Sequence, residues 1–264
     1  MNQIKLFIAI AGALLAAAGC GGAERSPRSK GHVRVAAAAD LNAALGALVE
    51  KFGESHDVDV TVSYGSSGTF YAQLLNRAPF DLFLSADIEY PRQLAARGLT
   101  IPDGEFTYAV GRLVVWVRAS SAVDPAHDGL SSLAGFAVKH VAIANPEHAP
   151  YGRAAIAALR ADGILDRVRP KLVYGENVAQ ALQFVQSGAA EAGIVALSLA
   201  LAPNLKDQGR WAEIPLTAYP RMEQGGTILR WAADVDSAKA LRAFVVGADG
   251  RTLLKQYGFF LPGT

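Results

Sequence analysis

Cysteine is nearly missing from this sequence: only one of the 264 residues, Cys20, is a cysteine. A single cysteine excludes an internal disulfide framework and a zinc site of the Cys-pair type. Net charge is also nearly missing, because 25 Lys and Arg residues stand against 24 Asp and Glu residues, which leaves +1. Nucleic-acid-binding domains and polybasic lipid-binding surfaces need a strong positive excess, so the composition speaks against both. The length leaves ample chain for a large core, in one domain or in two.

The common motifs of catalysis and cofactor binding are absent as well. The sequence contains no G-x-x-x-x-G-K-[ST], no G-x-G-x-x-G after a strand, no H-E-x-x-H and no G-x-S-x-G. No two of the five histidines lie four residues apart on a predicted helix, so we expect neither a metal site nor a cofactor. Asp81 and Asp87 flank the segment DLFLSAD and leave one enzyme hypothesis open, a hydrolase that uses them as acid and base. Aspartates at such positions more commonly accept hydrogen bonds from turn N–H groups.

The N-terminal apolar run, residues 6–18, is about thirteen residues long, which suits the core of a signal peptide better than a membrane span. It leads into the tripeptide AGC, which ends at Cys20 and resembles a bacterial lipoprotein cleavage signal, although Ala17 replaces the usual aliphatic residue. We therefore expect residues 1–20 to be a signal peptide cleaved before a lipidated Cys20; a plain secretory signal is the alternative. Residues 21–31, GGAERSPRSKG, are typical of a flexible tether. The folded part is expected outside the cytoplasm, on the periplasmic or cell-surface side.

Strand-like and helix-like segments alternate along the rest of the chain. Strands are predicted at Val33–Ala38, Val58–Tyr64, Asp81–Ser85, Tyr108–Val117, His140–Ala144, Lys171–Tyr174, Gly193–Leu197 and Thr227–Ala232. Helices are predicted at Leu41–Phe52, Phe70–Asn76, Tyr90–Arg97, Gly152–Arg160, Val178–Gln186, Ser237–Val246 and Gly250–Tyr257. This alternation predicts an α/β fold of mainly parallel sheets flanked by helices, which binds ligands at the carboxyl ends of its strands.

Two of the apolar segments are unusually long, Tyr108–Val117 and Thr227–Ala233. We interpret them as two crossovers that form the hinge of a two-lobed molecule. Lobe one would then consist of residues 32–111 and 226–264, and lobe two of residues 112–225. A single undivided sheet is the alternative.

At four places a predicted strand ends in small or polar residues and leads at once into a helix. These places are Ala38–Leu41, Gly65–Thr69, Ala149–Gly152 and Gly175–Val178. The first turn of a helix has unpaired N–H groups and a partial positive charge, so it binds anions without any lysine or arginine. Taken singly, Asp40, Ser66 or Ser67, and Asn177 need be no more than N-caps. Four such helix starts, two in each expected lobe, favour a site for an oxyanion.

These residues lie in segments that carry a family resemblance. The segments are VRVAAAADLNAALGALVEKF, VDVTVSYGSSGTFYAQL, APFDLFLSAD, GRLVVWV, VAIANPEHAPYGRAAIAAL, GENVAQALQFVQSGAAEAGIV and KQYGFFLP. In these segments the chain resembles the molybdate-binding proteins of bacterial ABC importers, a family with the type II periplasmic-binding fold. The resemblance implies a monomeric binding protein that captures molybdate or tungstate between two lobes and delivers it to an inner-membrane permease.

The resemblance also implies which residues hold the anion. Ser67 matches a serine that donates its hydroxyl and its N–H, and Ser66 is its neighbour. Tyr151 and Val178 match backbone N–H donors whose side chains shape the pocket without bonding. Asp40 lies at the first helix start, where many members of the family have serine or asparagine.

Asp40 and Ala196 depart from the family's pattern. Some members have a tyrosine hydroxyl at the position of Ala196, so that donor is missing here. An ionised carboxylate at Asp40 only accepts hydrogen bonds and repels a dianion. Either the side chain turns away to cap the helix Leu41–Phe52 while its N–H serves the anion, which we favour, or the ligand brings a proton. The second case would move selectivity toward a protonated oxyanion of the phosphate kind.

Overall fold

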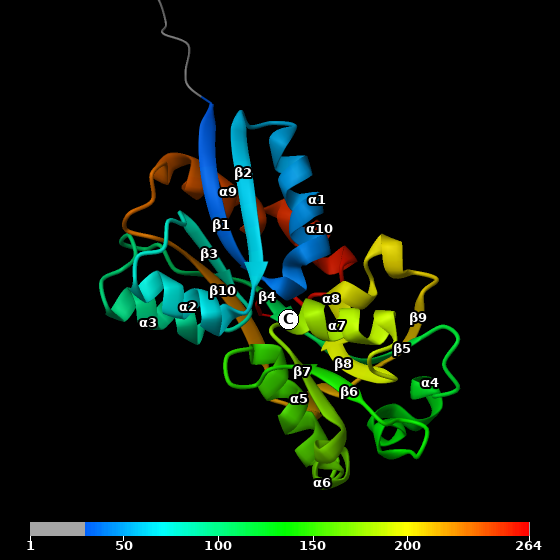
Figure 1. Cartoon of the computed structure of the whole chain (residues 1–264). Helices are drawn as coiled ribbons and strands as arrows, with labels where there is room; N and C mark the ends of the chain where they lie inside the picture. The colour runs from blue at the N-terminus through cyan, green and yellow to red at the C-terminus, as the bar shows by residue number, and fades with distance from the viewer. Residues whose placement is uncertain (1–29, 264) are drawn as a thin grey trace, which may run out of the picture.

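The computed structural model describes residues 30–263, so the predicted signal peptide and Cys20 lie outside the described residues. The chain forms two five-stranded sheets, each flanked by helices (Figure 1). The strands are β1 (Gly31–Ala38), β2 (Val58–Gly65), β3 (Leu82–Ser85), β4 (Phe106–Gly111), β5 (Leu113–Arg118), β6 (Val141–Ala144), β7 (Leu172–Gly175), β8 (Ala192–Ala196), β9 (Gly209–Glu213) and β10 (Met222–Ile228). The helices are α1 (Asn42–Gly53), α2 (Ser67–Leu75), α3 (Glu89–Ala96), α4 (Pro125–Asp128), α5 (Pro150–Ala161), α6 (Leu165–Val168), α7 (Val178–Ser187), α8 (Leu197–Ala200), α9 (Val235–Val246) and α10 (Ala248–Gln256). Between residues 30 and 263, no helix is both long and apolar enough to cross a membrane.

Both sheets have the same pattern of strand directions. The first sheet has the order β2-β1-β3-β10-β4, and the second has the order β7-β6-β8-β5-β9. In the first sheet β10 runs antiparallel to both of its neighbours, and in the second sheet β5 does the same. The remaining pairings are parallel. Each sheet is therefore mixed, with one strand opposed to the other four.

The chain passes twice between the two sheets. In the first passage β4 belongs to one sheet and β5 to the other, with only Arg112 between them, so the single strand predicted over Tyr108–Val117 is two strands. The second passage connects β9 to β10. There the strand predicted over Thr227–Ala232 begins at Met222 and ends at Ile228. The polar residues at the start of β10 are not typical of a buried strand, so the sequence did not indicate where it begins. Leu229, just after the strand, packs on the α2–α3 side of the sheet.

Alternating side chains of the first sheet build two hydrophobic layers, because successive residues of a strand point to opposite faces. Val33 and Val35 of β1 pack in one cluster with apolar residues of α1, α9 and α10. Ala36 of β1 and Phe83 of β3 pack on the other face with α2 and α3. Figure 1 shows α1, α9 and α10 together on one side of this sheet and α2 and α3 on the other.

The two halves of the molecule touch at the carboxyl ends of their parallel strands. Ala38 at the end of β1, Ala39 after it and Ala86 after β3 belong to the hydrophobic cluster of the second sheet. The contact therefore lies where a ligand site is expected in sheets of this kind.

Candidate functional site

A small cavity lies between the two sheets, and all five residues predicted to bind an oxyanion line it: Asp40, Ser66, Ser67, Tyr151 and Val178. The other lining residues are small or uncharged, and the described wall contains no lysine, arginine or histidine. The open volume of the cavity, about 10 Å³, is close to that of a single water molecule, so the cavity has no room for a sugar or a peptide.

Ser66 and Ser67 lie at the start of α2 and use their hydroxyl groups differently. The Ser66 hydroxyl donates to the carbonyl oxygen of His148 at 2.5 Å, so its proton joins the two halves of the molecule. The Ser67 hydroxyl oxygen accepts the N–H of Ala86 at 2.9 Å, and its own proton remains to be donated. Ser67 is 1% exposed. Its hydroxyl is therefore oriented as a donor next to the first, unpaired N–H groups of a helix.

The start of α5 offers a free backbone N–H because its first residue is a proline. Pro150 is the first residue of this helix and has no N–H, so the first helical N–H belongs to Tyr151. The next two N–H groups, of Gly152 and Arg153, donate to the carbonyl oxygen of Ala149. The helix start thus offers the N–H of Tyr151 at the cavity.

At the start of α7 Asn177 is the N-cap, as its position in the sequence indicates. Its side-chain oxygen accepts the N–H groups of Ala179 and Gln180, both at 3.0 Å. This cap satisfies the second and third N–H groups of the helix and leaves the first, on Val178, without a partner inside the helix.

Asp40 does not cap the following helix, so that prediction is wrong. Residues Ala39–Leu41 form a short 3-10 turn, η1, and α1 begins at Asn42 with no side chain capping it. Asp40 lies within the turn, which is not the position from which a side chain reaches the second or third helical N–H. The carboxylate instead meets two side chains from distant segments: Oδ2 accepts the Tyr151 hydroxyl at 3.0 Å and the Gln224 amide at 2.6 Å.

Burial dominates the electrostatics of Asp40. The residue is 1% exposed, and burial raises its pKa to about 6, although the hydrogen bonds from Gln224 and Tyr151 act to lower it. Burial, together with the neighbouring charge of Asp40, also raises the pKa of the hydroxyl groups of Tyr151 and Tyr108. Both tyrosines therefore stay neutral hydrogen-bond donors. The Tyr151 side chain donates its hydroxyl to Asp40, and the expectation that this side chain makes no bond to the anion stays a prediction.

Several contacts beside the cavity join the two halves, and the sequence did not indicate them. The carbonyl oxygen of His148 also accepts the N–H of Gly68 at 2.9 Å, and a Cβ on Gly68 would collide with this oxygen. The guanidinium of Arg153 on α5 donates to the Asp87 carboxylate at 2.6 Å and to the Tyr90 hydroxyl at 3.2 Å. These contacts hold the two sides of the cavity together.

Gln224 is another residue that sequence reasoning missed. It lies in β10, is fully buried, and donates to both Asp40 and Tyr151 behind the cavity wall. A polar residue in a short strand ordinarily faces solvent, so no local signal marks it. Ala196 is also fully buried and does not line the cavity, while nearby Ser198 donates to the carbonyl oxygen of Asp40 at 2.7 Å.

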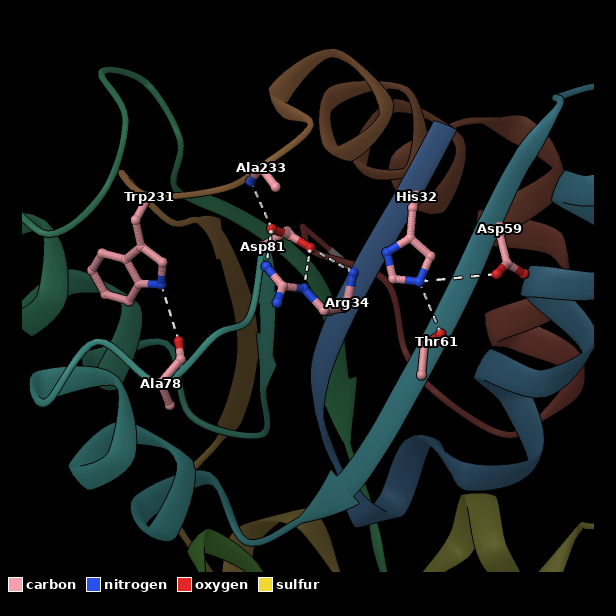
Figure 2. A network of polar contacts seen from close by, with 8 residues as sticks. All are labelled: His32, Arg34, Asp59, Thr61, Ala78, Asp81, Trp231 and Ala233. Carbon is pink, nitrogen blue, oxygen red and sulfur yellow. Dashed lines mark hydrogen bonds and ion pairs between the residues drawn. The ribbon is translucent and has the colours of Figure 1, made fainter. Parts of the chain in front are cut away.

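The two aspartates of the hydrolase hypothesis are both engaged in structural contacts. Figure 2 shows Asp81 between Arg34 and Ala233, where its carboxylate accepts both the backbone and the guanidinium of Arg34 and the N–H of Ala233. Burial tends to raise the pKa of Asp81, but these hydrogen bonds and the guanidinium charge hold it below its usual range. Asp87 accepts the N–H of Glu89 in a turn and pairs with Arg153. Neither carboxylate lines the cavity.

The site is suited to holding a small anion and offers little for other chemistry. Among residues 30–263 no cluster of three or more His, Cys, Asp or Glu side chains could hold a metal ion. The cavity instead combines the N–H groups at helix starts with the Ser67 hydroxyl, and such donors satisfy an oxygen-rich anion without any cationic side chain.

Known proteins resemble this chain along most of its length. Residues 33–260 match a family described as bacterial extracellular solute-binding protein. Molybdate-binding protein ModA of Azotobacter vinelandii is 36% identical over 97% of both chains, and the protein of the same name from Rhodobacter capsulatus is 35% identical over 88% of this chain and 90% of its own. The solved structure of the Azotobacter vinelandii periplasmic molybdate-binding protein superposes with a TM-score of 0.82 at 33% identity, covering 87% of this chain and 99% of the other.

Proposed function

Since this chain belongs to the family of bacterial extracellular solute-binding proteins, we propose that it captures molybdate or tungstate and delivers it to the permease of an ABC importer. Two relatives named as molybdate-binding proteins match 97% and 88% of this chain. Proteins of this family bind a solute and pass it on unchanged, so the chain is a transport protein and not an enzyme.

One observation carries the choice of an oxyanion: the described wall of the cavity contains several hydrogen-bond donors and no cationic side chain. The donors are the Ser67 hydroxyl and the N–H groups at the starts of η1, α2, α5 and α7. A fully deprotonated tetrahedral oxyanion has only acceptors, so its oxygens suit these donors. Hydrogen bonds to charged groups stabilise by about 1.5–3 kcal/mol each, which allows tight binding without an ion pair.

Selection against sulfate would depend on size, because sulfate presents the same acceptors on a smaller ion. We propose that the two lobes, residues 32–111 with 226–264 and residues 112–225, close over the anion about the two passages between the sheets. The bridges from His148 and Arg153 to the opposite lobe would then form on closure.

The protein acts outside the cytoplasm, as its family description indicates. We propose that residues 1–20 are removed as a signal peptide and that a lipid on Cys20 anchors the protein, with residues 21–31 as the tether. The mature chain would work as a monomer that meets its permease at the inner membrane.

Calorimetric titration of the mature protein with molybdate, tungstate, sulfate and phosphate, at two pH values, tests the proposal. We expect molybdate and tungstate to bind much more tightly than sulfate at neutral pH. Binding of phosphate with neither molybdate nor tungstate would refute the proposal and favour the second candidate, a carrier of another oxyanion. The observation that favours this candidate is the carboxyl group of Asp40 in the cavity wall.

A further inference from the structure

Among the described residues that line the cavity, Asp40 alone has a charged side chain, and none of the others offers it a cation. Its Oδ2 accepts hydrogen bonds from Tyr151 and Gln224, both neutral groups. Its Oδ1 is buried and has no hydrogen-bond partner among the described residues. Burial disfavours the charged form of a carboxyl group, most of all where an oxygen has no donor.

The surroundings of Asp40 offer no compensating charge. The titratable groups that interact with its charge are the hydroxyls of Tyr151 and Tyr108, and burial raises the pKa of both. Of the elements that pack against η1, α7 and α8 contain no charged residue, and the charged residues of α1 and β2 (Glu50, Lys51 and Asp59) are exposed. Helix α8 brings the Ser198 hydroxyl to the backbone carbonyl of Asp40. A doubly charged anion in this cavity would therefore meet the carboxylate with nothing between them to neutralise the repulsion.

We propose that Asp40 takes up one proton from solvent when a doubly charged oxyanion binds, so that the closed complex holds a neutral carboxylic acid beside the dianion. This inference rests on the proposed function. In the step, the carboxylate and one solvent proton become the carboxylic acid, and the anion stays unchanged.

Two features of the site favour this protonation. In the protein without an anion, burial already raises the pKa of Asp40 to about 6. The like charge of a bound dianion raises it further. A neutral carboxyl group also gains one O–H donor, while Oδ2 continues to accept from Tyr151 and Gln224. Protonation of Oδ1 thus turns an acceptor in the wall into a donor.

The consequence is a rule of selectivity. With Asp40 protonated, the wall presents donors to the ligand, so an anion that carries its own proton, such as hydrogen phosphate, would place that proton against a donor. The site would prefer fully deprotonated oxyanions, and its affinity for them would fall as the pH rises.

Titration calorimetry of the unmodified mature protein with molybdate, in two buffers of different ionisation enthalpy, measures the protons taken up. At about pH 8 we expect close to one proton per anion, and a dissociation constant that rises about tenfold per pH unit above the pKa of Asp40 in the open form. Tungstate and sulfate serve as further probes, since the proton belongs to the protein and not to the anion.

The variant Asp40→Asn keeps the shape and removes the charge, so its uptake is expected to fall to zero, with tighter binding than the unmodified protein at about pH 8. Asp59→Asn is the matched control, because it removes an equal charge from an exposed position on β2 whose side chain is 62% accessible. The control is expected to retain the uptake.

The outcomes separate the inference from the proposed function. Binding of molybdate by the unmodified protein without proton uptake would overturn the inference alone. Weaker binding by Asp40→Asn at every pH would also overturn it, because Asp40 would then act as an ionised acceptor for a protonated ligand. If none of the three anions bound at any pH, both the proposed function and the inference would fail.

Discussion

Replacement of Ser67 by alanine separates the two tasks of its hydroxyl. The oxygen accepts the N–H of Ala86 at 2.9 Å, and this fixed bond aims the remaining proton away from Ala86. Under the proposed function the proton goes to an oxygen of the anion. The variant Ser67→Ala removes both bonds at once. Loss of the bond to the anion weakens binding, and loss of the bond from Ala86 lowers the stability of the protein.

The structure sets the size of each effect. Loss of one hydrogen bond to a charged ligand costs about 1.5–3 kcal/mol, which corresponds to an increase of about 10- to 150-fold in the dissociation constant. The N–H of Ala86, on a residue 2% exposed, would be left without its acceptor, which lowers the free energy of unfolding by about 1–3 kcal/mol.

Ser66→Ala is the matched control, because it is the adjacent serine and its proton goes to the carbonyl oxygen of His148 instead. Loss of that neutral bond between the halves is expected to weaken binding by only about 2- to 10-fold. Calorimetry with molybdate gives the dissociation constants, and urea denaturation without ligand gives the stabilities. The reasoning is refuted if Ser67→Ala retains full affinity, or if both variants weaken binding equally.

Three further predictions concern two residues beside the cavity and one carboxylate away from it. Gly68→Ala places a Cβ against the carbonyl oxygen of His148, so it should hinder closure and speed ligand release in stopped-flow measurements, and an unchanged release rate would contradict this. Arg153→Gln removes an ion pair with 41% and 27% exposed side chains, so we expect a change of only about 2- to 5-fold in release rate, and no change in high salt. Asp81→Ala should leave ligand affinity unchanged but lower the free energy of unfolding by about 1–3 kcal/mol, since the partly buried N–H groups of Arg34 and Ala233 lose their acceptor; a loss of binding without a loss of stability would contradict this. Because the folded-state pKa of Asp81 is depressed, its contribution is full above the unfolded-state pKa and is lost as the pH falls through the folded-state value.

Local chemistry made much of the fold and the candidate site predictable. The alternation of apolar residues placed strands and helices close to where they lie, because side-chain periodicity depends on the local backbone geometry. The capping role of Asn177 and the free N–H of Tyr151 behind Pro150 follow from the same local rules. Each of these features involves residues only a few positions apart.

The errors arise where distant segments meet. Asp40 has the chemistry of an N-cap, and only the arrival of Tyr151 and Gln224 from far along the chain draws its carboxylate elsewhere. Arg112 separates two strands of different sheets inside one apolar run, and nothing in the run itself marks the change.

The sequence alone was therefore sufficient to predict an α/β chain with almost no net charge and with helix starts suited to an anion. The tertiary structure decided that the five residues predicted at these helix starts surround one cavity, and that one of them is a buried carboxyl group without a cation. The physical reason is that burial and pairing are properties of the whole packed molecule: the pKa of Asp40 depends on which neutral groups surround it, and the order of residues does not state this.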